Sequence, residues 1–483
     1  MTTKTIIDST HKGWWFITTL VIAGVVLTEA AFAAQTPEIV LKQVQSGTWN
    51  VTYNLAHPAK RLEFVRVRDE SRAQRWRPTD EQFELKHSAD LDVITRKDEG
   101  SFSNVSFNIP ATYIHVRKEY APFSPFSDGG LLIHSGRYHV CAGEERRVAC
   151  PKDDTGDEGP WRITISPPTG AHVILHGEVV NGPVTFFDTH DGTNIYVGPA
   201  IPLETEHFLA VIDSDLPKNI HEKLFTYLPQ FIEYFSQRLH KLSNRPMLFV
   251  SRDPELRTSG YSSQGGTLPN QIFMHLYGEG WDKEPDPATA HFIPWFFAHE
   301  AAHLFQKSRV SDAGFGSNPW IHEGSADAFA SLSIKKFDPE ADEYVMTRVS
   351  NAFKDCVQEL SKMSGDPINA ADKHGAFDVY YSCGMLMNLA ADSSVRRASK
   401  GEKDLFDIWK VFLEEIDSGA VYAQATYLSV IERMGDAGTA EFLRKFASDP
   451  QTDPRATLLS GLKSAGVNED ILDELNAVDS AGE

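Results

Sequence analysis

The segment WFFAHEAAHLFQ, residues 295–306, places three polar side chains inside an apolar run. His299 and His303 are four residues apart, so on a helix they lie one turn apart on the same face. Their imidazoles can therefore converge on one cation, with bonds of about 2.0–2.1 Å if that cation is zinc. Glu300 is rotated by about 100° from His299 around the helix, so it does not point at the same cation. It can instead take a proton from a water molecule, which makes H-E-x-x-H typical of zinc-dependent hydrolysis.

The alternative for this segment is a buried helix that carries the three polar residues by chance. Two histidines and a glutamate on an otherwise apolar helix need partners, because polar groups are costly to bury unpaired. A zinc ion would be one such partner. A catalytic zinc ion requires three protein ligands and an open fourth position, so the pattern demands a third ligand elsewhere in the chain.

The segment WIHEGSADAFA, residues 320–330, contains a third ligand in the right form. Glu323 follows His303 by 20 residues, across a Gly/Ser-containing stretch that can turn the chain back. Asp327 comes one helical turn after Glu323 and can accept the free ring N–H of a ligand histidine. His322 is the competing ligand, because neighbouring helical residues point about 100° apart and only one can face the site. The aspartate four residues after Glu323 favours Glu323 as the ligand.

The N-terminus has the layout of a secretory signal peptide, residues 1–33. Two lysines precede the apolar run at residues 14–27, and Ala-Phe-Ala at 31–33 has the small-x-small form of a cleavage site. The apolar run has 14 residues, whereas a membrane-spanning helix needs about 20. We expect an exported protein, periplasmic or secreted, with no membrane span after cleavage. An uncleaved membrane anchor formed by residues 14–33 is the alternative.

The chain has four cysteines, and an exported protein can oxidise them. Cys141 and Cys150 flank an eight-residue segment, and we expect a disulfide to join them. Cys356 and Cys383 could form a second disulfide or remain buried thiols. The chain contains no C-x-x-C, so cysteine is not expected to bind the metal.

The pattern of apolar residues changes near residue 203. Residues 34–202 contain short alternating runs separated by turn-forming residues, which predicts an all-β, sandwich-like module. Residues 203–400 combine helical periodicity with a few strands, and residues 260–277 read as a Gly-rich loop followed by a strand. Residues 401–483 are predicted to be helical. The expected fold class is therefore α+β.

The charge and the remaining motifs exclude other classes of function. The net charge is −21, whereas a nucleic-acid partner would require a basic face. The chain contains no G-x-S-x-G, no P-loop and no dinucleotide-binding glycine pattern.

The segments HEAAH and WIHEGSADAFA together resemble the gluzincin clan of zinc metallopeptidases, in its aminopeptidase-like branch. The second helix of that branch often reads W-x-x-E-G-x-A, and a later tyrosine lies in a Y-x-x-G context. Here VYYSCGMLMNLAAD provides Tyr381 and Gly384 in that context. The resemblance implies that Tyr381 stabilises the oxyanion formed when water attacks a carbonyl, with the adjacent Tyr380 as the alternative. A phenol O–H suits that role.

The resemblance also implies a thermolysin-like α+β peptidase domain over residues 203–400, preceded by the β module and followed by C-terminal helices. His299, His303 and Glu323 would bind one zinc ion per chain, Glu300 would be the general base, and the substrate would be a peptide or protein. The chain departs from the branch at residues 265–276, GGTLPNQIFMHL, where the glutamate of G-x-M-E-N is absent. That departure leaves cleavage at chain ends or within chains open.

Two other functions are compatible with these motifs. One is a zinc hydrolase that acts on a substrate other than a peptide. The other is a non-catalytic binding protein on a metallopeptidase fold, which would be recognised by the loss of Glu300 or of a zinc ligand. The chain retains all of these residues.

The signal peptide predicts that the mature protein begins near Ala34, because the cleavage triplet ends at residue 33. N-terminal sequencing of the protein from its native host measures this directly. A chain that still begins near Met1 and sediments with membranes would instead establish the anchor.

Overall fold

The computed structural model describes residues 34–116, 119–144, 146–152, 156–189, 191–307 and 318–477. The expected signal peptide, residues 1–33, lies outside the described residues. Within them, no helix is both long enough and apolar enough to cross a membrane.

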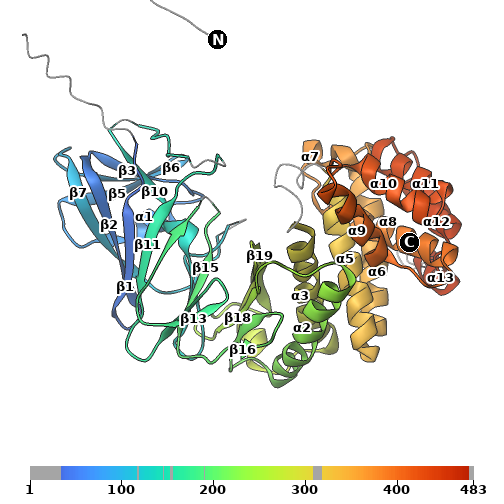
Figure 1. Cartoon of the computed structure of the whole chain (residues 1–483), viewed down its shortest axis with the longest axis horizontal. Helices are drawn as coiled ribbons and strands as arrows, with labels where there is room; N and C mark the ends of the chain where they lie inside the picture. The colour runs from blue at the N-terminus through green and yellow to red at the C-terminus, as the bar shows by residue number, and fades with distance from the viewer. Residues whose placement is uncertain are drawn as a thin grey trace, which may run out of the picture. The chain divides into compact units, whose positions relative to one another are not determined.

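The first part of the chain is all-β and forms three sheets (Figure 1). The first sheet has the order β14 (Val184–Asp188), β11 (Trp161–Ser166), β1 (Glu38–Gln45), β2 (Thr48–Ala59), β7 (Phe102–Pro110) and β4 (Arg77–Pro78). The second has the order β10 (Val140–Gly143), β3 (Arg61–Phe64), β6 (Leu91–Arg96) and β5 (Phe83–Ser88). The third has the order β13 (Glu178–Asn181), β12 (His172–Leu175), β15 (Asn194–Gly198), β9 (Leu131–His134) and β8 (Phe123–Pro125). A short helix, α1 (Ser71–Arg75), precedes β4.

Alternation of apolar and polar residues sets the register of these strands. Ile39 of β1 pairs with Tyr53 of antiparallel β2 and with Ile163 of parallel β11, and all three are buried. A shift of one residue would turn each of these side chains to the opposite face of the sheet. The core of the β part therefore fixes the pairing.

A fourth sheet begins the second part of the chain. Its order is β16 (Leu203–Glu204), β17 (Leu209–Ile212), β18 (Met247–Asp253), β20 (Gln271–Tyr277) and β19 (Ser262–Leu268). Strands β17, β18 and β20 are parallel, whereas β19 is antiparallel to β20 and occupies the edge.

Residues 260–277 were expected to form a Gly-rich loop and then a strand; the strand is β20, but the expected loop is largely strand β19, which forms a hairpin with β20. Gly265 and Gly266 lie within β19, where they pair with Met274 and Phe273. A Cβ at Gly265 would lie 2.5 Å from the ring of Phe296, so the glycine serves close packing rather than flexibility.

Helices form the rest of the chain. The longer ones before residue 400 are α2 (Lys218–Arg238), α3 (Pro287–Lys307), α5 (Pro319–Phe337), α6 (Asp342–Lys362) and α8 (Asp378–Ala398), with the short α7 (Ala371–His374) before α8. The C-terminal helices are α9 (Leu405–Asp417), α10 (Gln424–Met434), α11 (Ala437–Ser448), α12 (Pro454–Ala465) and α13 (Glu469–Ala477). The observed fold class is α+β, as expected.

Two glycines allow α5 and α8 to pack backbone against backbone. A Cβ at Gly324 of α5 would lie 2.2 Å from the carbonyl carbon of Gly384 in α8, a distance that no side chain can occupy. A Cβ at Gly384 would in turn lie 2.7 Å from the backbone oxygen of Trp320. The E-G-x-A and Y-x-x-G patterns thus share a physical role, since their glycines bring two helices into direct contact.

Two disulfides are present in the structure. Cys141 on β10 is bonded to Cys150, with Cα atoms 5.4 Å apart. Cys356 on α6 is bonded to Cys383 on α8, with Cα atoms 4.8 Å apart. The second disulfide therefore ties α6 to the helix that carries Tyr380 and Tyr381.

The β part and the second part are joined by side chains as well as by the chain itself. The Tyr113 hydroxyl donates to Gln264 Oε1 on β19 at 2.6 Å, and the Tyr120 hydroxyl donates to the Thr267 carbonyl at 3.1 Å. Gln264 Nε2 donates back to the Glu119 carbonyl at 2.8 Å. Tyr113, Glu119 and Tyr120 of the β part therefore hold the edge strand β19 in place.

Replacement of Gly324 by alanine should lower the free energy of unfolding by about 1–3 kcal/mol or more, the range for overpacking a tight interior contact. The added methyl group would force α5 away from α8. Denaturant unfolding of the mature protein measures the change.

Gly266→Ala is the matched control, because the nearest atom to its added Cβ is 3.8 Å away. Equal stability of the two variants would show that the close helix contact does not contribute as described.

Candidate metal and catalytic site

Helix α3 begins after a stable N-terminal cap and then runs through the interior. Asp286 accepts hydrogen bonds from the backbone N–H and the hydroxyl of Thr289 at 3.0 and 2.8 Å, and Pro287 occupies the first helical position. From Ile293 onward most side chains are buried. The polar residues His299 and His303 are therefore carried into a dry environment.

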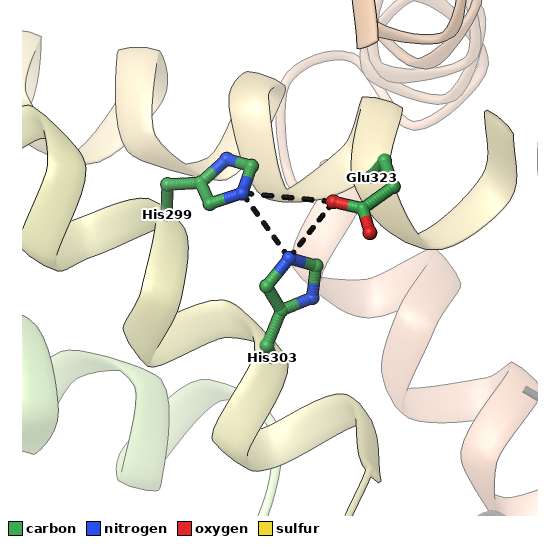
Figure 2. Close-up of side chains that lie close together, drawn as sticks. All are labelled: His299, His303 and Glu323. Carbon is green, nitrogen blue, oxygen red and sulfur yellow. Dashed lines mark hydrogen bonds and ion pairs between the residues drawn. The ribbon is translucent and has the colours of Figure 1, made fainter. Parts of the chain in front are cut away.

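The structure brings together the three side chains that the sequence predicts as ligands. Figure 2 shows His299 and His303 on one helix and Glu323 on a second, with their polar atoms converging. His303 Nε2 lies 3.1 Å from His299 Nε2 and 3.0 Å from Glu323 Oε2. His299 Nε2 lies 3.7 Å from the same carboxylate oxygen. Among the described residues, this is the group of His, Cys, Asp and Glu side chains close enough to hold a metal ion.

The donor set and spacing fit zinc. Two imidazole nitrogens and one carboxylate oxygen are a ligand set of catalytic zinc sites. A tetrahedral ion bound at about 2.0–2.1 Å requires ligand atoms about 3.3 Å apart, which lies between the shortest and longest of the observed distances. Two Nε2 atoms that face each other cannot both carry a proton without repulsion, so a cation between them resolves the contact.

Hydrogen bonds on the far side of each ring hold the two histidines in this orientation. His299 Nδ1 lies 2.7 Å from Asp327 Oδ1, and His303 Nδ1 lies 2.9 Å from Gln306 Oε1. A ring that donates from Nδ1 keeps the lone pair of Nε2 free for a metal. Asp327 was expected in this role, whereas Gln306 was not. The sequence does contain one indication of this role: Gln306 follows His303 by three residues and so lies on the same face of α3.

Gln306 also connects the two helices of the site. Its Nε2 donates to Ser325 Oγ at 2.9 Å and to the His322 carbonyl at 3.3 Å, both on α5. Its single amide thereby orients His303 and fixes α5 beside α3.

Burial and charge act in opposite directions on the ligands when no metal is bound. Burial lowers the pKa of His299, but the hydrogen bond and charge of Asp327, with the charges of Glu300 and Glu323, raise it to about 9. Burial raises the pKa of Glu323, but the charge and hydrogen bond of His303 outweigh it and hold that pKa well below the usual range. The pocket therefore keeps its carboxylate ionised and attracts positive charge, either protons or a metal ion.

Glu300 is not among the side chains whose ligand atoms converge. Its carboxylate oxygen Oε2 accepts a hydrogen bond from the Thr267 hydroxyl on β19. Glu300 also lines a cavity of about 600 Å³ together with His299, Asp327 and Tyr381. Thr267 was missed by sequence reasoning, because it lies on a strand 33 residues before Glu300 with no local pattern to link them.

The structure separates the two candidate tyrosines. Tyr381 lines the cavity, and its ring centroid lies 6.1 Å from that of His299. Tyr380 is buried, and its ring lies 6.5 Å from that of Phe377. Burial, followed by the charges of Glu323, Glu300 and Asp327, raises the pKa of Tyr381, so its hydroxyl keeps its proton and remains a donor.

His322, the competing ligand, lies behind Glu323 rather than beside the two histidines. Its Nε2 is 3.5 Å from Glu323 Oε1, whereas His303 contacts the other carboxylate oxygen, Glu323 Oε2. Its Nδ1 is 3.4 Å from the Tyr422 hydroxyl on the segment after α9. His322 is thus placed to support the carboxylate of Glu323.

A second hollow of about 720 Å³ adjoins the cavity, and the two share Arg348 and Asn351 of α6. The guanidinium carbon of Arg348 lies 3.7 Å from the ring centroid of Trp295, one turn before His299 on α3. The stacked arginine holds this wall of the cavity.

Comparison with known proteins gives similarity in structure but not in sequence. No protein-family model matches this chain, and no curated protein matches it. An aminopeptidase N family protein from Idiomarina loihiensis is 11% identical with a TM-score of 0.59, over 88% of this chain and 78% of that one. At this identity the likeness concerns the fold alone. The two proteins share the order of an all-β part, an α+β part and a helical part.

Two further structures are similar at lower scores. The M1 zinc metallopeptidase from Deinococcus radiodurans is 14% identical with a TM-score of 0.43, over 87% of this chain and 95% of that one. Native yeast LTA4 hydrolase is 13% identical with a TM-score of 0.46, over 89% of this chain and 70% of that one. At these TM-scores neither structure adds to the comparison of folds.

The converging ligand atoms predict about one zinc ion per chain in protein purified without chelators. Glu323→Ala should weaken zinc binding because it removes a ligand oxygen, and Asp327→Asn should weaken it by about 10–100-fold because it disturbs the orientation of His299. Elemental analysis and titration against a zinc indicator measure both effects. Glu343→Ala, at an exposed glutamate of α6, is the control and should bind zinc like the unmodified protein. Absence of zinc uptake by the unmodified protein would exclude the site.

Proposed function

We propose that this protein is an exported, zinc-dependent metallopeptidase that hydrolyses peptide bonds. One observation carries the proposal: His299 of a zinc-type ligand set, the Glu300 carboxylate and a protonated tyrosine, Tyr381, line a single cavity. Acyl hydrolysis needs an electrophilic carbonyl, a deprotonated water and a donor for the oxyanion, and these groups correspond to those needs.

His299, His303 and Glu323 would hold the zinc ion, and Asp327 and Gln306 would keep both rings in the tautomer that binds it. The chemistry that zinc supplies when bound is Lewis acidity toward a carbonyl oxygen and a water molecule. All further steps are performed by side chains of the chain.

Glu300 acts as the general base. It removes a proton from the attacking water and delivers it to the leaving amine. The Thr267 hydroxyl donates to one of its carboxylate oxygens, Oε2, and thereby holds the group at the edge of the cavity. The other oxygen, Oε1, is then free to take the proton. Because Thr267 lies on β19, this orientation depends on the strand that Tyr113, Glu119 and Tyr120 hold in place.

Tyr381 donates a hydrogen bond to the oxyanion that develops on the carbonyl oxygen. Its hydroxyl keeps its proton because burial and three nearby carboxylates raise its pKa. Its position on the cavity wall near His299 supports this role, and the buried position of Tyr380 argues against the neighbour.

Export is supported by the leader at residues 1–33 and by the two disulfides of the described chain. Both disulfides would be reduced in most cytosols. We therefore place the mature protein in the periplasm or outside the cell, acting on a peptide or protein substrate.

Glu300→Gln should reduce peptide turnover by about two to four orders of magnitude, the range for loss of a positioned acid–base group. The amide still accepts from Thr267 but cannot take a proton, so zinc content and thermal stability should stay unchanged. Cleavage of a peptide library, read by mass spectrometry, measures turnover. Glu414→Gln is the control, since that glutamate is exposed on α9 and lines neither hollow. Full activity of Glu300→Gln would refute the mechanism.

Tyr381→Phe should reduce turnover by about 100-fold or more, the scale for one lost oxyanion donor, while zinc content stays the same. Tyr380→Phe provides the matched comparison at the next residue and should keep most of the activity. The same peptide assay measures both. If Tyr380→Phe is inactive and Tyr381→Phe is active, the role belongs to Tyr380.

A further inference from the structure

A buried arginine in the β part lacks a partner. Arg137 lies in the short turn Ser135–Tyr138, and its side chain is 2% exposed. Its Nε and Nη1 atoms are buried and have no hydrogen-bond partner within the described residues. A charged guanidinium in that state is strongly unfavourable, because neither water nor a counter-charge replaces its hydration.

The carboxylates near Arg137 are committed to other groups. Asp92 is paired with Arg72, and Glu119 accepts from Arg66 Nη1 at 3.0 Å. The Asp69 carboxylate accepts from the backbone N–H of Ser71 at 3.0 Å. These three acids contribute long-range attraction to Arg137 but none of them forms an ion pair with it.

Arg137 lies among charges of both signs. Burial, followed by the charge of Arg72, lowers the pKa of Arg137 to about 9, although Glu119, Asp69 and Asp92 act against this. At neutral pH the group is still protonated. The site therefore contains a buried positive charge whose Nε and Nη1 atoms have no direct partner within the described residues.

A small cavity of about 10 Å³ lies against this guanidinium. Arg72, Arg75 and Ser71 of the α1 segment line it together with Arg137, and Trp76 and Ile109 add an apolar wall. Its size corresponds to about one water-sized sphere, so it admits a single water or a monatomic ion. Arg137 and Ser71 offer buried N–H and O–H donors, Arg72 and Arg75 add positive charge, and no carboxylate lines the cavity.

We propose that this cavity binds one small monovalent inorganic anion of the size of chloride. The volume excludes phosphate and sulfate, and the arginines exclude a metal cation. A chloride ion would accept from Arg137 Nε and Nη1 and neutralise the buried charge. The ion would thereby stabilise the β part of the fold, which makes this site independent of the proposed peptidase activity.

The test is a series of thermal melts at constant ionic strength, with sodium gluconate replaced stepwise by sodium chloride or bromide. Gluconate is too large for the cavity. The unmodified protein should melt about 2–4 °C higher in chloride than in gluconate, the shift expected when a bound ligand adds modest stability to a large domain. Arg137→Met should lose this dependence, and Arg77→Met, at an exposed arginine of the same part, should keep it.

Crystals of the unmodified protein grown or soaked in bromide give a second measurement, which does not depend on the folding of a variant. An anomalous peak beside Arg137 Nε and Nη1 would support the site. No peak there, or a chloride dependence that persists in Arg137→Met, would overturn the proposal. In that case the cavity holds a water molecule, and halides act elsewhere.

Discussion

Two helix backbones touch at Gly324 and Gly384, and the geometry of the candidate site depends on that contact. Helix α5 carries Glu323 immediately before the first glycine, and α8 carries Tyr381 one turn before the second. Because no side chain separates the helices, Glu323 and Tyr381 come close enough for the Glu323 charge to raise the pKa of Tyr381. The Cys356–Cys383 disulfide, one residue from Gly384, ties the same helix to α6 and so restrains it from the other side.

Orientation within the site comes from a small number of hydrogen bonds between elements. Asp327 and Gln306 each hold one histidine ring, and Thr267 holds the carboxylate of Glu300. These three bonds begin on α5, α3 and β19, so each functional side chain is supported by a different part of the fold. A site arranged in this way needs little reorganisation when substrate binds, which is the condition for electrostatic catalysis.

The residues that could be predicted from sequence are those whose spacing within one helix carries the information. The spacing of His299, Glu300 and His303 follows the helical repeat. Glu323 and Asp327, four residues apart on the next helix, likewise lie on one face. The α+β fold class followed from the change in periodicity near residue 203. Thr267 could not be found in this way, because its contact with Glu300 depends on how a strand packs beside a helix.

The two glycines of β19, which predict a loop, lie in a strand for a related reason. A pair of adjacent glycines usually marks a turn, but here Gly265 makes room for the ring of Phe296 and the strand continues. Local propensity was overridden by a tertiary contact that sequence alone does not reveal. Arg137 is a similar case, since an arginine between glycine and tyrosine gives no sign that it is buried.

The side chains that join the β part to β19 also bear on how this chain can be divided. Phe126, Leu132 and Tyr196 of the β part share one buried cluster with Phe249 and Phe273 of the fourth sheet. A fragment starting near residue 203 would expose that cluster and leave Gln264 without its partners. The peptidase-like half is therefore not a portable module, and gene fusions or domain exchanges that cut at this junction would yield aggregating protein. Natural variation at positions 113 and 264 should be correlated for the same reason.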